Sequence, residues 1–161
     1  MAAILEKFPY ITSGWGMRIH PISGESSFHN GCDLRANKDN LFSPENGKVI
    51  KIWTDNKNGK AIRILHDNKI TAYAHLNSIF CSLNDEIKAG QLIGQTGNSG
   101  NSTGPHLHFG IQQKIDNKWT WIDPTFYIFR MYFTQIKIAL PIIASIVGLV
   151  LASSLLATKK G

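Results

Sequence analysis

Short segments in which apolar and polar residues alternate make up most of residues 45–125. A period of two is typical of strands that bury one face. The clearest of these segments are Lys48–Trp53, Ala61–His66 and Ile70–His75. The dipeptide Asp67-Asn68 predicts a tight hairpin between the last two, in which Ala74 and His75 point to opposite faces. Because no convincing amphipathic helix precedes the C-terminal apolar run, the pattern predicts a mostly β fold.

The segment Ser102–Gln112, with the sequence STGPHLHFGIQ, predicts a further strand whose two faces differ in character. In an extended strand His106 and His108 point to one side, whereas Leu107 and Phe109 point to the other. One face therefore resembles core and the other resembles a site. Alone, such a histidine pair is equally consistent with a sheet surface that carries two histidines by chance.

The C-terminal residues 138–157 carry no charged side chain. At about 1.5 Å per residue they span a bilayer core of about 30 Å, which predicts one transmembrane helix. A buried core helix is the alternative, but the run is apolar on all sides and leaves no face for solvent. Small residues at Ala144, Gly148 and Ala152 favour helix association in the membrane. The preceding residues 126–137 include four aromatic residues expected at the headgroup boundary, namely Tyr127, Phe129, Tyr132 and Phe133.

The length and the net charge of the chain limit the number of domains and the kinds of partner that it can have. The 161 residues suffice for one ordinary domain. The net charge is +6, but residues 1–125 contain 13 Lys and Arg against 11 Asp and Glu. Since Lys and Arg residues do not cluster along any predicted helix or strand, no nucleic-acid partner is expected. Cys32 and Cys81 lack the spacing of a zinc or redox pair and are expected to be small buried residues.

A second pair of metal-ligand residues lies in the segment FHNGCDLR, where His29 and Asp33 are four residues apart. Zinc at catalytic sites commonly takes three His or carboxylate ligands and keeps a fourth position for water. His29, Asp33 and one histidine of the HLH segment would complete that set. Two neutral imidazoles and one carboxylate leave a zinc site with net charge +1, which lowers the pKa of a bound water.

Three separated motifs in one order carry a family resemblance. They are HNGCDL at His29–Leu34, YAHL at Tyr73–Leu76 and GQLIGQTGNSGNSTGPHLHFGI at Gly90–Ile111. Together with RIHPISG upstream, they resemble the lysostaphin-type (LytM-like) zinc metalloendopeptidases, which cleave peptide cross-links of bacterial peptidoglycan. The resemblance implies a two-layer antiparallel β-sheet domain with an open active-site groove, the duplicated hybrid motif.

Carried over by position, the resemblance implies that His29, Asp33 and His108 are ligands of one Zn²⁺ per chain. It makes His75 and His106 the catalytic pair, which orient and deprotonate water and stabilise the oxyanion. Which of the two is the general base stays open. The expected organisation is a lead-in (1–13), a zinc metallopeptidase domain (14–125), an aromatic juxtamembrane segment (126–137), the transmembrane helix (138–157) and a basic tail (158–161).

The chain departs from the family pattern at two positions. Gly110 follows HLHF where many relatives carry Glu, and it shares a face with both histidines, so its missing side chain is expected to widen the groove or to loosen the support of His108. Cys32 replaces an aliphatic residue inside the HxxxD motif. His66, beside the Asp67-Asn68 turn, is expected to be exposed.

The sequence thus predicts a membrane-anchored zinc endopeptidase that hydrolyses peptidoglycan cross-links. Alternatives are a catalytically silent wall-binding or activator module of the same fold, and a peptidase for protein substrates. The N-terminus does not resemble a signal peptide. Two routes to the wall follow: post-translational insertion into the bacterial envelope, or delivery in the membrane of a phage virion among other virion proteins. The second is the preferred prediction.

Overall fold

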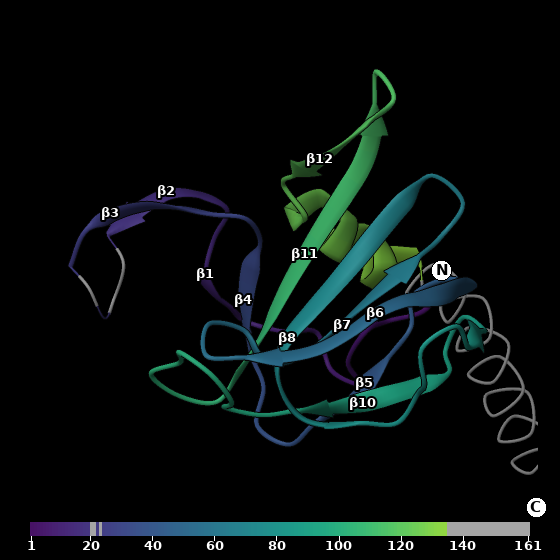
Figure 1. The fold of residues 1–161 in the computed structure, drawn as a ribbon, viewed down its shortest axis with the longest axis horizontal. Helices are drawn as coiled ribbons and strands as arrows, with labels where there is room; N and C mark the ends of the chain where they lie inside the picture. The colour runs from purple at the N-terminus through teal and green to yellow at the C-terminus, as the bar shows by residue number, and fades with distance from the viewer. Residues whose placement is uncertain (20–21, 23, 135–161) are drawn as a thin grey trace, which may run out of the picture.

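The structure is a computed structural model, which describes residues 1–19, 22 and 24–134 (Figure 1). The described residues form twelve strands and one helix, which covers residues 125–134. The strands are β1 (Ile11–Ser13), β2 (Gly16–Ile19), β3 (Ser26–His29), β4 (Cys32–Arg35), β5 (Asn40–Phe42), β6 (Gly47–Asp55), β7 (Gly59–Leu65), β8 (Lys69–Ile79), β9 (Glu86–Ile87), β10 (Leu92–Thr96), β11 (His106–Ile115) and β12 (Lys118–Ile122). The prediction of a mostly β, antiparallel domain is confirmed.

The four segments predicted as strands correspond to β6, β7, β8 and β11. The hairpin between β7 and β8 is also present, and the backbone N–H of His66 donates to the carbonyl of Lys69 across it at 2.8 Å. Strands β6, β7 and β8 are extended by a few residues beyond the predicted segments. The alternation of apolar and polar residues therefore predicted the central strands of the domain, each of which has one apolar face.

Hydrogen bonds join ten strands into one sheet, with the order β1-β4-β11-β8-β7-β6-β9 along its main path. The sheet divides at β8. This strand pairs with β11 from Lys69 to Ala74, and with β10 from Leu76 to Ile79. Strand β10 also pairs with β5, and β12 with β11. The two-layer sheet implied by the resemblance thus takes the form of one sheet that branches between Ala74 and Leu76.

The core lies on the face of the central strands that carries Tyr73 and Phe109, both fully buried. Strand β10 contributes Ile93 to it. The N-terminal residues 1–13, predicted as a lead-in, add Ile4 and Leu5, which are almost inaccessible to solvent. The first residues of the chain are therefore part of the folded unit.

The helix over residues 125–134 differs from the sequence prediction, which had no helix before the apolar run and placed these aromatics at a membrane surface. It is amphipathic, since Ile128, Met131 and Tyr132 recur at helical spacing and are buried in the core. The Tyr132 hydroxyl donates to the carbonyl of Leu5 at 3.0 Å and accepts its N–H at 3.1 Å. Tyr132 is thus a core residue, whereas Phe133 is exposed.

The predicted transmembrane helix (138–157), with its small-residue spacing, and the basic tail (158–161) lie outside the described residues. In the described part of the chain, no helix is both long and apolar enough to cross a membrane.

Strands β2 and β3 form a separate two-stranded sheet that extends from the main body beside β4 (Figure 1). This two-stranded arm carries exposed apolar side chains, among them Met17 and Phe28, which are 67% and 51% exposed. Ile19, Ile22 and Phe28 of this arm line one side of a groove of about 850 Å³. The groove runs over the sheet face opposite the core, and its lining includes every residue predicted for the site.

Candidate metal centre and groove

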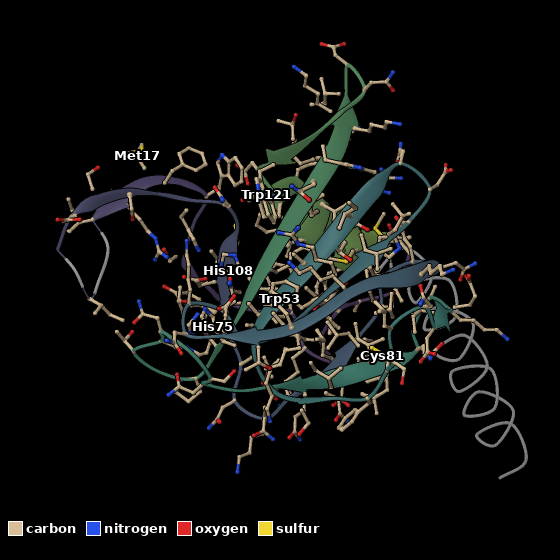
Figure 2. The ribbon with its side chains drawn as sticks, in the orientation of Figure 1. Met17, Trp53, His75, Cys81, His108 and Trp121 are labelled. Atoms are coloured by element: carbon tan, nitrogen blue, oxygen red, sulfur yellow. The ribbon has the colours of Figure 1, made fainter. Side chains whose placement is uncertain are left out.

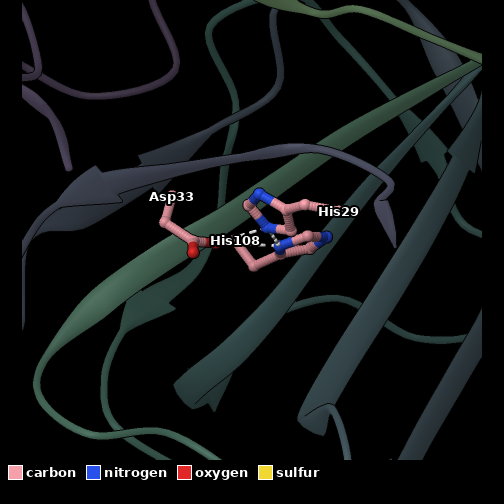
Figure 3. A group of neighbouring side chains, drawn as sticks. All are labelled: His29, Asp33 and His108. Carbon is pink, nitrogen blue, oxygen red and sulfur yellow. Dashed lines mark hydrogen bonds and ion pairs between the residues drawn. The ribbon is translucent and has the colours of Figure 1, made fainter. Parts of the chain in front are cut away.

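Three predicted metal ligands meet in the groove from three strands. Asp33 on β4 lies directly opposite His108 on β11, and His29 ends β3. Asp33 Oδ1 lies 2.9 Å from His108 Nδ1 and 3.1 Å from His29 Nε2, and the two ring nitrogens are 3.0 Å apart (Figure 3). One ligand atom from each side chain thus faces a common point, so these residues could hold a metal ion.

The electrostatics of this cluster favour an ionised carboxylate. Burial opposes ionisation of Asp33, but hydrogen bonds with the rings of His108 and His29 outweigh it and hold the pKa of this carboxyl well below its usual range. Burial also lowers the pKa of His108, despite the carboxylate beside it. The carboxylate is therefore charged and the His108 ring is biased toward its neutral, metal-binding form.

The orientation of His29 tests whether a cation fits this cluster. Its Nδ1 lies 2.7 Å from the carbonyl of Gly14, which can only accept, so Nδ1 carries the proton. Nε2 faces the Asp33 carboxylate oxygen at 3.1 Å, and it either carries a second proton, which makes the hydrogen bond to Asp33, or has a lone pair in the neutral ring. Two lone pairs at this distance repel each other unless a proton or a metal cation lies between them. The donor set of two imidazoles and one carboxylate matches zinc.

Arg18 on β2 holds the outer oxygen of the carboxylate. Its Nη1 lies 3.3 Å from Asp33 Oδ2 and donates to Ser13 Oγ at 2.8 Å. Oδ2 is thereby turned toward the arm while Oδ1 faces the histidines. Sequence reasoning did not assign Arg18 a role, although it opens the motif RIHPISG.

His75 reaches the groove because its backbone breaks the alternation of β8. Ala74 pairs with His108 on the groove face, so strict alternation would turn His75 toward the core. Its φ of 60° lies instead in the left-handed region, where non-glycine residues are uncommon and strained. The ring consequently packs 4.6 Å from that of His106, and Figure 2 shows it near His108. The branch point of the sheet thus positions this histidine.

His75 and His106 present the same ring nitrogen to the groove. His75 Nδ1 donates to the carbonyl of Ser99, and His106 Nδ1 to that of Gly104, both at 2.8 Å. Each Nε2 of the neutral rings is left as an acceptor, and that of His106 lies 3.7 Å from Asp33 Oδ1. Burial lowers the pKa of His75 to about 4, so this ring is neutral near pH 7.

Two glycines, Gly31 and Gly110, lie in close contact with side chains of the groove. The prediction that Gly110 widens the groove was wrong. A Cβ on Gly31 would lie 2.8 Å from the His108 ring, so the HNGCDL glycine lets this ring approach the backbone. A Cβ on Gly110 would lie 2.8 Å from the Trp121 ring and 2.9 Å from the carbonyl of Asn30. Gly110 does not leave the groove wider there, because Trp121 occupies the space above it.

Two further side chains lie away from the cluster. His66, predicted as exposed, is buried: its Nδ1 donates to the carbonyl of Asn46 and its Nε2 accepts from Thr71 Oγ1, both at 2.8 Å. That prediction was wrong because the hairpin folds the ring inward. Cys32 is fully buried as expected and pairs with Phe109 on the core face, opposite to Asp33.

Residues 27–124 match the profile of a known family, Peptidase family M23. This segment contains all five predicted site residues and covers more than half of the chain. The chain belongs to peptidase family M23. The predicted resemblance to lysostaphin-type enzymes is therefore confirmed, and hydrolysis of peptides is the activity of the family.

Individual known proteins also resemble the chain. Peptidoglycan DD-endopeptidase ShyB of Vibrio cholerae is 36% identical over 107 residues, covering 63% of this chain and 24% of that protein. A zinc-containing peptidase from Vibrio cholerae superposes with a TM-score of 0.65 at 32% identity, over 74% of this chain and 37% of the other. The catalytic domain of lysostaphin from Staphylococcus simulans gives 0.64 at 28%, over 74% and 92%.

The chain spans less than a third of the length of the curated relatives that it matches. Against the lysostaphin catalytic domain it covers nearly the whole length. The likeness is therefore to the catalytic unit of this family.

Proposed function

We propose that this chain is a zinc-dependent endopeptidase that hydrolyses peptide cross-links of bacterial peptidoglycan. The observation that carries the proposal is the convergence of His29, Asp33 and His108 on one point, with His75 and His106 beside it in an open groove. The family membership and the zinc-containing peptidase among the similar structures support zinc as the metal. ShyB supports peptidoglycan as the substrate class.

The proposed ligands are His29 Nε2, Asp33 Oδ1 and His108 Nδ1. A bound zinc ion supplies Lewis acidity, which polarises the scissile carbonyl and lowers the pKa of a water molecule. Two neutral imidazoles and one carboxylate leave this centre a net charge of +1 when it is loaded. The hydrogen bond from His29 to Gly14 fixes the ring so that Nε2 faces the centre.

His75 and His106 serve in this proposal as the general acid–base catalyst and as the donor that stabilises the oxyanion. Their Nε2 atoms are acceptors in the groove, so one ring takes a proton from the attacking water and later donates it to the leaving amine. The other ring takes a proton from bulk water, donates a hydrogen bond from Nε2 to the oxyanion, and returns the proton to bulk water after the oxyanion collapses. Because carbonyl groups hold Nδ1 of both rings, each ring meets the substrate in one orientation.

The test compares the full chain with His108→Ala and with His66→Gln, a substitution at a buried histidine outside the groove. Zinc content is measured by plasma mass spectrometry after dialysis, and wall lysis by the clearing of purified sacculi. We expect one zinc per chain and clearing for the parent and His66→Gln, and neither for His108→Ala. Full clearing by His108→Ala would contradict the proposed site.

A catalytically silent wall-binding module is the alternative within the same fold. The intact five-residue site favours catalysis, because a binding module needs no pair of histidines with free acceptor nitrogens beside a metal-binding cluster. A silent module would bind sacculi and leave every cross-link intact. A peptidase for protein substrates would share the site and would cleave an unfolded protein faster than sacculi.

We also propose that residues 138–157 anchor the enzyme in a membrane and that phage virions deliver it to the wall. The charge-free run of twenty residues supports the anchor, and the need of such an enzyme to reach the wall supports delivery. Recovery of the full chain with membranes after carbonate washing, and its detection in purified virions, are the expected results. A carbonate-soluble chain would contradict the anchor, and virions without the protein would contradict the delivery.

A further inference from the structure

Arg63 on β7 lies in the groove between two tryptophan side chains. Its guanidinium carbon is 5.5 Å from the ring centroid of Trp53 on β6 and 5.3 Å from that of Trp121 on β12. All three side chains are partly buried and line the groove. Figure 2 shows both tryptophans on the part of the sheet that carries His108. Contacts with both indoles restrict the guanidinium to one position.

The guanidinium of Arg63 has no carboxylate and no hydrogen-bond acceptor among the described residues. Its Nε is buried without a hydrogen-bond partner. Burial also lowers the pKa of this group, as expected for a cation that has lost water and gained no anion. A buried polar group without a partner is unfavourable, so Arg63 has donors available for a ligand.

The sheet register places Arg63 near the metal centre. Arg63 pairs with Ala72, and Ala72 pairs with Gly110. In the next row on the same face, Ala74 pairs with His108. His108 thus lies two residues along and two strands across from Arg63, which correspond to about 7 Å and about 10 Å. Because Ala72 and Ala74 form the groove floor between them, an extended peptide that passes beside Trp121 can contact both His108 and Arg63.

One further cation and one carboxylate lie near Arg63. Lys51 pairs with Arg63 across β6 and β7, and its Nζ lies 4.9 Å from the Trp53 ring centroid. The nearby acidic residue Asp55 accepts hydrogen bonds from Trp53 Nε1 and from Asn58. It therefore holds the indole in place and forms no ion pair with Arg63 among the described contacts. A planar guanidinium in such surroundings matches a carboxylate, which it can bind through two parallel hydrogen bonds.

We propose that Arg63, held between Trp53 and Trp121, binds a free carboxylate of the peptide substrate within a few residues of the scissile bond. This inference rests on the proposed function and adds to it a preference for acidic peptides. The carboxylate comes from the peptide C-terminus or from an acidic side chain, which are one ligand chemistry for the guanidinium. The contact determines specificity and takes no part in the proton transfers.

The experiment uses the zinc-loaded full chain and three synthetic cross-linked peptides. One has all carboxylates free, the second has its C-terminal carboxylate amidated and the third has its acidic side chain amidated. Both kcat/KM and, by calorimetry, Kd are measured for the parent, Arg63→Gln, Arg63→Lys and Arg130→Gln. Arg130 is an exposed helix residue outside the groove and serves as the charge-matched control.

We expect the parent and Arg130→Gln to favour the free peptide about ten- to hundredfold over one of the amidated peptides, which identifies the carboxylate. Arg63→Gln should reduce this ratio to near one with the zinc content unchanged, and Arg63→Lys should keep part of it. Equal values for all three peptides with the parent, or an unchanged ratio in Arg63→Gln, would overturn the inference. Preferential binding without cleavage would contradict the proposed function alone. If Arg63→Gln does not fold, the parent's ratio and Arg63→Lys decide.

Discussion

Asp33 and His108 lie directly opposite each other in the antiparallel ladder of β4 and β11, with Asp33 Oδ1 2.9 Å from His108 Nδ1. Paired residues of such a ladder project from the same face, so the register alone brings the carboxylate and the imidazole together. His29 joins them through the short connection from β3 to β4, in which Gly31 leaves room for the His108 ring. The candidate metal cluster is thus built on strands and not on a mobile loop.

Removing the imidazole of His75 or His106 should separate catalysis from metal binding. Neither ring belongs to the cluster of three ligand atoms. We expect His75→Ala and His106→Ala to keep one zinc per chain while kcat falls about 10²- to 10⁴-fold, since general acid–base catalysis typically contributes this much. Zinc analysis and turnover of a cross-linked peptide are measured on the same samples. Loss of zinc from both variants would assign these histidines to the metal instead.

Arg18 is expected to act as a positioning residue for Asp33. Replacement by Met removes the contact with Asp33 Oδ2 and frees the carboxylate to rotate. The affinity for zinc should then fall about 10- to 100-fold, as is typical when a group that orients a ligand is lost. Competition with a fluorescent chelator measures the affinity, and Arg18→Lys should restore part of it. Tighter zinc binding by Arg18→Met would indicate that the guanidinium competes with the metal.

Gly110→Ala tests the packing of Trp121 over the groove floor. The added methyl group would meet the indole at 2.8 Å and a backbone carbonyl at 2.9 Å, so something must shift. We expect a loss of about 1–3 kcal/mol in the free energy of unfolding, measured by urea denaturation. Gly104→Ala is the matched control, because no atom lies within 4 Å of its added methyl. Equal stability of the two variants would refute the close packing.

The buried His66 predicts a pH dependence of stability. Burial lowers its pKa in the folded state, so the unfolded state binds the proton more tightly. Its contribution to stability is fully present above the unfolded pKa of about 6.5 and is lost as the pH falls from there through the folded pKa. His66→Gln should therefore lose less stability than the parent between pH 7.5 and pH 5.5 in urea titrations. Parallel losses would show that this ring does not titrate with folding.

The sequence was sufficient for the strands of the sheet centre because these depend on local alternation, whereas the roles of the five site residues came from the family resemblance and stay predictions. HxxxD and HLH each lie within a few residues, where alternation and short turns decide the geometry. His75 is different: alternation predicts that it faces away from Ala74, and the left-handed backbone at the branch of the sheet turns it into the groove. No local sequence pattern predicts that the sheet branches at this point of β8.

The contacts of Arg18 and Trp121 could not be predicted, since they depend on how distant strands are packed together. The sequence of the helix over residues 125–134 contains a helical pattern, but its aromatic residues were interpreted as contacts with a membrane surface. Its residues Ile128, Met131 and Tyr132 recur at helical spacing, but the neighbouring aromatics and the apolar run that follows suggested lipid contact. Tyr132 satisfies its hydroxyl on Leu5 in the core instead.

The most direct test of the central claim is mass spectrometry of the fragments released from sacculi of defined composition. The zinc-loaded full chain is compared with the chelated chain and with His108→Ala. We predict that cross-linked fragments disappear only with the loaded parent and that each yields two products whose summed mass exceeds that of the fragment by one water. Unchanged cross-links, in the presence of a chain that holds one zinc, would contradict the claim.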